Sequence, residues 1–146
     1  MEEIYQKLEK ILGKRMKKDH LLSEFTTFKT GGKAKVIVFP ENIEEVQKTL
    51  EISYNYRIPV IFLGMGSNVL ISDRGIDGIV IITSLMKKLG FENNYICAEC
   101  GVKVSSLLSF FILHGKGGLE FLAGIPGTIG GAVITNAGPV SYTHLR

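Results

Sequence analysis

The chain has 146 residues, of which 45% are apolar and 21% are charged. This size and composition are typical of one globular domain with a hydrophobic core, and they exclude wholesale disorder. The formal net charge is only +3, and the basic residues cluster between residues 14 and 18 without interleaved aromatic side chains. The composition therefore gives no support to a nucleic-acid partner.

The first ten residues, MEEIYQKLEK, lack the basic start and apolar stretch of a secretory signal. The most apolar segment, residues 104–113, contains three serines. It covers only about half of the length that a bilayer-spanning helix requires. We therefore expect a soluble, cytoplasmic protein without a membrane partner.

The first predicted element is an amphipathic helix that ends at Gly13. Its apolar residues recur at helical spacing among Glu, Gln and Lys: Ile4, Leu8, Ile11 and Leu12. The basic run 14–18 follows, and we interpret it as a solvated connector, with contact to an acidic partner as the alternative.

Next comes a predicted strand–helix–strand unit. Residues 34–39 form a β-branched run that Pro40 ends, which indicates a strand. A helix of about four turns follows, with Asn42 as N-cap and Glu45 three residues further on. The continuous apolar run 60–63 is typical of a strand buried on both faces.

The glycine-rich loop after that run is the first candidate site, and it comprises Gly64, Met65, Gly66, Ser67, Asn68 and Val69. Glycine permits positive φ, so successive backbone N–H groups can turn inward and bind an anion. Ser67 and Asn68 add side-chain donors. The pattern predicts binding of a nucleotide diphosphate, whereas the structural alternative is a tight turn between buried strands.

Two well-known phosphate loops do not fit this segment. A dinucleotide-binding G-x-G-x-x-G loop would place glycine where Val69 stands and would open a helix, whereas residues 69–73 are expected to form a strand. A Walker loop would need Gly-Lys-Ser/Thr at the right spacing. Further strands are expected at 79–82 and 95–99, and a helix at 105–114.

The stretch 115–138 is the second candidate site. It is dense in glycine, but its other residues are small or apolar, unlike those of a flexible linker. A bare backbone lets a planar ring lie against it and accept its hydrogen bonds. The alternative is a close crossing of a helix and a strand.

The two cysteines, Cys97 and Cys100, form a C-x-x-C pattern within a predicted strand. Redox-active pairs usually open a helix, which lowers the thiol pKa. A zinc site would need two more ligands nearby, and the three histidines are scattered singly. We therefore predict neither redox chemistry nor a metal.

Three segments, 26–34, 63–70 and 118–132, together closely resemble the UDP-N-acetylenolpyruvoylglucosamine reductase (MurB) family of flavoenzymes. The resemblance covers about residues 21–138. It implies an α+β, two-lobed FAD-binding domain of the vanillyl-alcohol-oxidase (PCMH) type. It also implies that residues 64–69 hold the FAD diphosphate and that a second set lines the cofactor: Gly124, Ile125, Pro126, Gly127, Thr128, Gly130, Gly131 and Ala132.

The resemblance also implies a domain plan. Residues 1–20 form the N-terminal helix and basic connector, and 21–138 form the FAD-binding domain, with lobes of about 21–84 and 85–138. The tail 139–146 does not match. We therefore expect a fragment that is incomplete at its C-terminus and lacks the substrate-binding domain.

In that family NADPH reduces FAD, and the flavin then reduces UDP-N-acetylenolpyruvoylglucosamine to UDP-N-acetylmuramate for peptidoglycan. The family's catalytic groups belong to motifs beyond residue 138, so no catalytic residue is assigned and the chain is expected to be inactive alone. Two alternatives stay open: part of another FAD-dependent oxidase or dehydrogenase of this domain type, and a nucleotide-binding module without catalysis.

Overall fold

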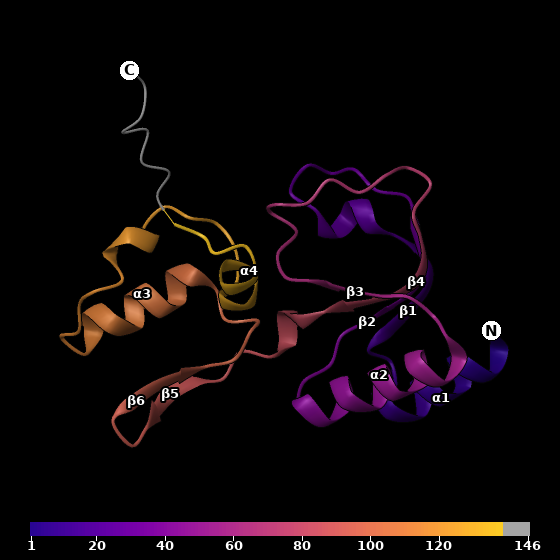
Figure 1. Ribbon diagram of the computed structural model, residues 1–146, viewed down its shortest axis with the longest axis horizontal. Helices are drawn as coiled ribbons and strands as arrows, with labels where there is room; N and C mark the ends of the chain where they lie inside the picture. Colours follow the sequence, from indigo (N-terminus) through magenta and orange to yellow (C-terminus); the bar gives the residue numbers. More distant parts are fainter. Residues whose placement is uncertain (139–146) are drawn as a thin grey trace. The chain divides into compact units, whose positions relative to one another are not determined.

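The structure, a computed structural model, describes residues 1–138, so the predicted tail 139–146 lies outside the described residues. The chain divides into two compact units (Figure 1). The first is Met1–Met86, and the second begins at Lys87. Each unit has its own sheet, of four strands in the first and two in the second. Within the described range, no helix is long and apolar enough to cross a membrane.

The sheet of the first unit has the strand order β1–β2–β4–β3. β1 (Met16–Leu21) pairs antiparallel with β2 (Lys33–Val38). Both β2 and β3 (Val60–Leu63) run parallel to β4 (Ile76–Ile82). The predicted strand–helix–strand unit is present as β2, α2 and β3, and β4 lies between β2 and β3 in the sheet.

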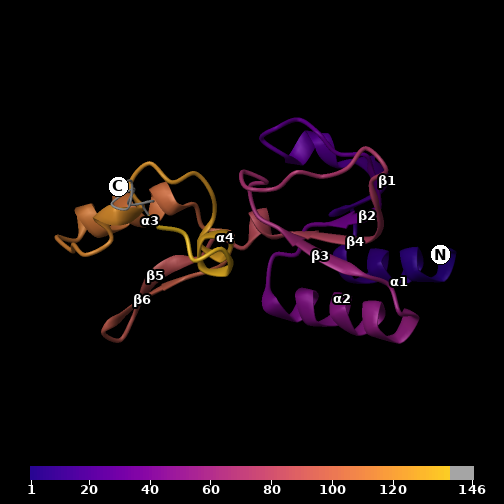
Figure 2. The same cartoon turned by 45° about the horizontal axis from the view of Figure 1, so that its top comes forward.

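Helices cover one face of this sheet, and loops cover the other (Figures 1 and 2). α1 (Glu2–Leu12) and α2 (Ile43–Tyr56) pack on the first face, and α1 buries Ile4, Leu8 and Leu12, as predicted. The short 3-10 helix Leu22–Phe25 and residues Val69 and Ile71 pack on the second face. A layer of apolar side chains thus lies on each side of the sheet.

A β-bulge sets which side chains of β2 face each layer. Residues two apart in a strand normally share a face, yet Val36 packs with the helices and Ala34 with the loops. The pairing of β2 with β4 shifts register between these two residues. The extra residue lies in β4, where Ile76 to Ile79 spans three steps opposite the two from Ala34 to Val36, and Ile37 lies with Ala34 on the loop side.

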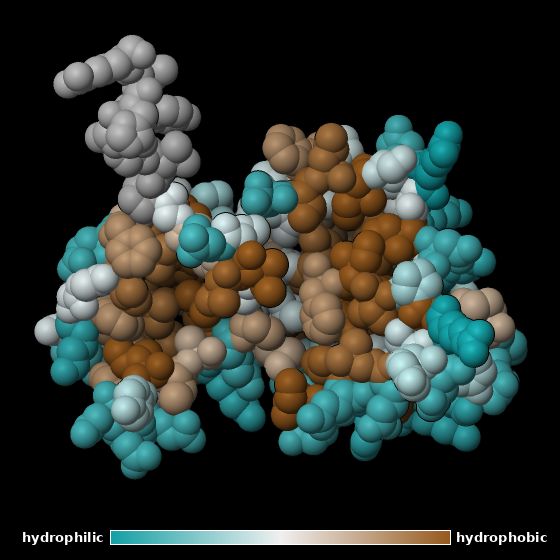
Figure 3. Space-filling view, viewed as in Figure 1, coloured by the Kyte–Doolittle hydropathy of each residue, from teal (hydrophilic) through white to brown (hydrophobic). Residues whose placement is uncertain are grey.

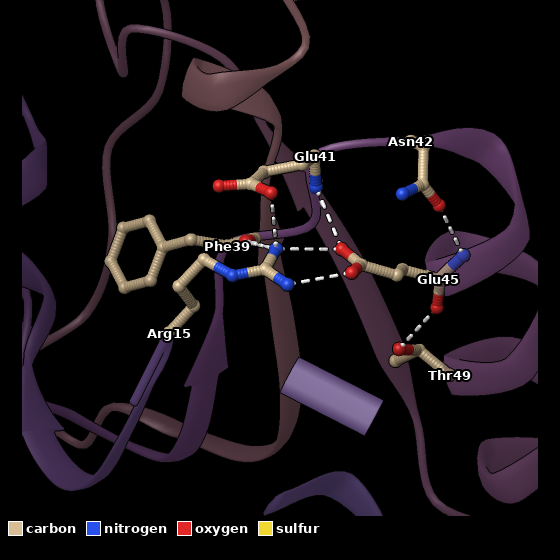
Figure 4. A network of polar contacts seen from close by, with 6 residues as sticks. All are labelled: Arg15, Phe39, Glu41, Asn42, Glu45 and Thr49. Carbon is tan, nitrogen blue, oxygen red and sulfur yellow. Dashed lines mark hydrogen bonds and ion pairs between the residues drawn. The ribbon is translucent and has the colours of Figure 1, made fainter. Parts of the chain in front are cut away.

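An ion-paired network fixes the start of α2 to the strand layer (Figure 4). The Arg15 guanidinium donates two hydrogen bonds of 2.6 Å to the Glu45 carboxylate and one of 3.2 Å to the Phe39 carbonyl. Asn42 is confirmed as the N-cap, because its side-chain oxygen accepts from the Glu45 N–H at 2.9 Å. The guanidinium lowers the pKa of Glu45 through these hydrogen bonds.

Three predictions about the first unit are wrong. Lys17 and Lys18 of the basic run lie in β1 rather than in a connector, because their backbone pairs with β2 while their side chains stay largely in solvent. β3 is an edge strand and is not buried on both faces: Ile61 and Phe62 are 43% and 53% exposed. Residues 69–73 form no strand, since the segment crosses the second face without ladder pairing.

The second unit combines a hairpin with short helices. β5 (Leu89–Glu92) pairs antiparallel with β6 (Tyr95–Ala98), and α3 (Val104–Leu113) follows. The predicted strand at 95–99 and helix at 105–114 are thereby confirmed to within a residue. Two more elements lie in the glycine-rich stretch, the 3-10 helix Glu120–Leu122 and the short helix α4 (Ile129–Ile134).

Candidate cofactor site

The first glycine-rich loop begins where β3 ends. Gly66 has φ 64°, whereas Gly64 does not adopt a positive φ. Only one of the two glycines therefore takes the left-handed conformation that turns neighbouring N–H groups to one side of the chain. The N–H groups of Gly66 and Asn68 donate no hydrogen bond to another residue of the described range. Asn68 is exposed, and its side chain is likewise unengaged there.

A turn formed by residues 26–30 packs against this loop. The Thr27 N–H donates to the Gly66 carbonyl at 2.9 Å. A Cβ at Gly66 would lie 2.2 Å from the Phe25 carbonyl oxygen and 2.9 Å from the Thr26 Cα. Gly66 is therefore required for two backbones to meet, in addition to any role toward a ligand.

The remaining loop residues have different surroundings. Val69 is partly buried and packs into the apolar layer on the second face of the sheet, so its side chain has a structural role. Met65 and Leu70 are 42% and 79% exposed. Figure 3 shows hydrophobic residues on the surface of the first unit on the side of these loops. Polar backbone and apolar surface thus lie next to each other here.

Main-chain pairing holds the second candidate segment against residues 100–104. The Ile129 N–H donates to the Val102 carbonyl at 2.8 Å, and the Gly130 N–H donates to the Cys100 carbonyl at 2.9 Å. The Val104 N–H donates in return to the Gly127 carbonyl at 3.1 Å. These groups are engaged within the protein, which makes part of this segment structural.

Gly130 of α4 approaches Cys100 closely, and Cys100 lies in a turn after β6 rather than in a strand, so the contact is not the helix-to-strand crossing given as the alternative. A Cβ there would lie 2.8 Å from the Cys100 Cβ and 3.0 Å from its carbonyl oxygen. Thr128 is buried and caps α4, since its hydroxyl oxygen accepts from the Gly131 N–H at 3.3 Å. Both residues therefore have folding roles that are independent of any cofactor.

Gly124 lies in an exposed part of the second segment. Gly124 has φ 81° and Gly127 has φ 141°. A Cβ on Gly124 would meet nothing within 4 Å. Open space beside a bare backbone is the feature that a planar ring needs, so the interpretation as a ring contact stays a prediction centred on Gly124.

The Cys97 thiol shows no sign of activation. Cys97 is exposed on β6, and its thiol contacts the Glu92 carboxylate at 3.1 Å. That carboxylate raises the pKa of the Cys97 thiol, which opposes formation of a thiolate. Among residues 1–138 no group of three or more His, Cys, Asp and Glu side chains is placed to hold a metal ion.

The fold and the glycine-rich loop agree with what the chain is similar to. Residues 34–144 match the FAD binding domain family. This match covers most of the chain, and the chain therefore belongs to the FAD binding domain family.

Individual relatives indicate a particular family of FAD-binding enzymes. The UDP-N-acetylenolpyruvoylglucosamine reductase of Caldicellulosiruptor saccharolyticus is 48% identical over 121 residues, which are 83% of this chain and 39% of the relative. The crystal structure of the MurB reductase from Thermus caldophilus superposes with a TM-score of 0.66 at 32% identity, over 82% of this chain and 41% of that one. The predicted resemblance to this family is confirmed, and the chain spans about two fifths of the relatives' length.

The fold is shared more widely. A p-cresol methylhydroxylase structure superposes with a TM-score of 0.62 at 17% identity, over 78% of this chain and 25% of that one. Together with the family match, this likeness confirms the predicted α+β FAD-binding fold of the PCMH type.

The residues present fit the diphosphate of FAD at the first loop. The N–H groups of Gly66 and Asn68 and the Asn68 side-chain amide have no hydrogen-bond partner in the described range. Gly66 also has the left-handed backbone conformation that occurs in anion-binding nests. The neighbouring turn also contains a buried hydroxyl oxygen, on Thr30, that has no hydrogen-bond partner among residues 1–138. Donors without acceptors are what a bound polyanion requires.

Sequence reasoning missed the role of the turn 26–30. The sequence patterns predict a loop here that resembles the family motif, and they give it no site role. The neighbouring pair Gly31–Gly32 marks a different crossing, because a Cβ on Gly32 would lie 2.1 Å from the Asp73 carbonyl oxygen. Such a pair indicates that two loops cross at backbone distance, although it does not say which loops.

Proposed function

We propose that this chain holds FAD within a reductase that converts UDP-N-acetylenolpyruvoylglucosamine into UDP-N-acetylmuramate in peptidoglycan synthesis, with NADPH as the reductant. The observation that carries the proposal is the set of unpartnered donors around Gly66. The similarity to relatives of that name supports the choice of substrate. A cytoplasmic location follows from a nucleotide-linked substrate of cell-wall synthesis.

In this proposal the residues of this chain bind FAD and orient it. The N–H groups of Gly66 and Asn68, with the Asn68 amide, hold the diphosphate, and Gly124 leaves room beside its backbone for a ring. Bound FAD supplies the hydride-transfer chemistry. No catalytic residue is assigned to this chain, and we place the substrate-binding domain and the catalytic groups in the part of the enzyme that the matched region does not cover.

Flavin binding by the 146-residue chain is the first test. FAD fluorescence should be quenched on titration with the protein, and Asn68→Ala should weaken FAD binding about tenfold, the value of one hydrogen bond to a charged group. Asn55→Ala is the matched control, since Asn55 is an exposed asparagine on α2 of the same unit. Unquenched fluorescence, or equal effects of the two variants, would contradict the proposed loop.

The reaction is tested separately with a longer protein that carries the genomic continuation of this sequence. NADPH oxidation that depends on the enolpyruvyl substrate is the expected result. A protein that binds FAD but oxidises a different substrate would place the chain among other FAD-dependent oxidases or dehydrogenases of this fold, the class to which the p-cresol methylhydroxylase likeness points.

A further inference from the structure

The proposed function assigns no role to the turn 26–30. This turn nevertheless contacts the loop 64–69, which is proposed to hold the diphosphate. The Thr27 N–H bonds to the Gly66 carbonyl, and the Thr26 backbone lies where a Gly66 side chain would stand. The turn closes on itself through the Lys29 N–H to the Thr26 carbonyl at 3.2 Å and the Thr26 hydroxyl to the Thr30 carbonyl at 2.8 Å. It is therefore a fixed structure beside the loop.

Lys29 is unusual within this turn. It has φ 56°, a left-handed conformation that costs energy for any residue with a Cβ. Glycine would remove that cost, yet the chain has lysine here and places its two glycines after Thr30, at Gly31 and Gly32. Strained backbone conformations tend to persist where a side chain is needed at that point for binding.

The Lys29 side chain also has an unused charge. Lys29 is exposed and forms no ion pair within 4.0 Å with a carboxylate of the described range. Lys29 contributes only weakly to the lowered pKa of Glu24, which is caused mainly by the hydrogen bond of 2.8 Å between the Glu24 carboxylate and His20. The ammonium is thus available to an anion.

A diphosphate in the Gly66 loop would be such an anion. The ammonium of an extended lysine lies roughly 6 Å from its Cα. This length is comparable with the distance between the two ends of a tight turn, which is less than about 7 Å. Backbone dipoles alone make the loop attractive to phosphate, but they leave the negative charge of the ligand uncompensated. A lysine ammonium in the turn that contacts this loop would supply that charge.

We propose that the turn 26–30 is the second wall of the phosphate site and that Lys29 supplies its positive charge. This inference rests on the proposed function, because the anion is the diphosphate of FAD. In the same turn, the buried Thr30 hydroxyl has no hydrogen-bond partner among residues 1–138.

Titrations of the 146-residue chain test the proposal. Lys29→Gln should weaken FAD binding roughly five- to twentyfold, as expected for one unit charge at that range in partly screened surroundings. It should weaken ADP binding, measured by displacement of FAD, by the same factor. The loss should shrink as sodium chloride approaches about 1 M, since screening then acts over a few ångströms.

Two variants serve as controls. Lys48→Gln removes an exposed lysine from α2, on the opposite face of the sheet, and should leave FAD affinity unchanged. Lys29→Gly removes the charge together with the strained conformation, so it should weaken FAD binding as Lys29→Gln does while the ligand-free melting temperature does not fall.

The outcomes separate the two proposals. If the unaltered chain binds FAD and Lys29→Gln binds it equally well, the assignment of Lys29 is wrong and the proposed function stands. An equal loss in Lys48→Gln, or a loss for FAD without one for ADP, also overturns the assignment. If the unaltered chain binds neither FAD nor ADP, the proposed function fails and the assignment fails with it.

Discussion

The two glycine-rich segments use glycine for different physical reasons. Gly66 is buried against the backbone of residues 25 and 26, so its missing side chain is a condition of folding. Gly124 is exposed, and a Cβ there would meet nothing within 4 Å. The same residue type therefore marks a closed crossing of two loops in one unit and an open surface in the other. Glycine density alone does not distinguish these two situations.

The two units that contain these segments also differ in how much apolar surface they bury. Both large clusters of buried apolar residues lie in the first unit, on the two faces of its sheet. The second unit has a two-stranded sheet and leaves Ile112, Leu113, Val133 and Ile134 at least 73% exposed. Substitutions in the first unit should consequently affect stability more than substitutions in the second.

The largest effect is expected for Gly66→Ala. A Cβ 2.2 Å from a carbonyl oxygen forces the two loops apart, and the left-handed backbone adds strain, so the free energy of unfolding should fall by about 3 kcal/mol or more. Urea unfolding measures this. Gly13→Ala is the control, since Gly13 has φ 57° but no neighbour within 4 Å. Equal losses in both variants would show that backbone strain, and not the crossing, makes Gly66 necessary.

Gly130→Ala should have the next largest effect. The added methyl would lie 2.8 Å from the Cys100 Cβ, and relieving that contact should cost about 2 kcal/mol. Hydrogen exchange should locate the change in the second unit, at the amides that pair residues 127–130 with 100–104. Faster exchange in β2 and β4 as well would mean that the two units do not respond separately.

Glu45→Gln tests the clamp on α2 in the first unit. The carboxylate and the Arg15 guanidinium are 14% and 27% exposed, so the pair is partly screened and its loss should cost about 1–2 kcal/mol. The folded-state pKa of Glu45 lies below its ordinary value of 4.5, mainly through the Arg15 hydrogen bonds. Its contribution is therefore present above about pH 4.5 and is lost as the pH falls through the folded-state pKa.

Acid titration of stability provides the check for the clamp. The difference in unfolding free energy between the unaltered chain and Glu45→Gln should be constant near neutral pH and should shrink below pH 4.5. Glu44→Gln, an exposed neighbour on the same helix, is the control and should show no such difference. A gap that stays unchanged down to pH 2 would refute the ionic origin of the clamp.

The smallest stability effect is expected for Gly124→Ala. Only backbone strain at φ 81° opposes it, for about 1 kcal/mol. If a ring of FAD lies against this backbone, the same methyl should weaken FAD binding about tenfold, measured by fluorescence titration. Unchanged affinity would remove Gly124 from the cofactor site and leave it as a turn residue.

Much of the fold could be predicted because local patterns dictated it. The spacing of Ile4, Leu8 and Leu12 gives α1 a buried face, and Asn42 caps α2 as its sequence position indicated. The strand at 69–73 was predicted wrongly, because an apolar, β-branched segment that covers a sheet has the same composition as one that joins it. Composition also could not show that β1 pairs with β2, because its basic side chains stay largely in solvent.

The candidate site divides in a similar way. The sequence by itself determined that residues 64–68 form a glycine-rich loop after a strand and, through three motifs, that the chain resembles a flavin-binding family. Only the tertiary structure decided that the turn 26–30 supports this loop, that Val69 belongs to the core and that Gly130 is a packing residue. The physical reason is that backbone dihedral preferences depend on local sequence. The residue that packs against a glycine, by contrast, can lie far away in the sequence.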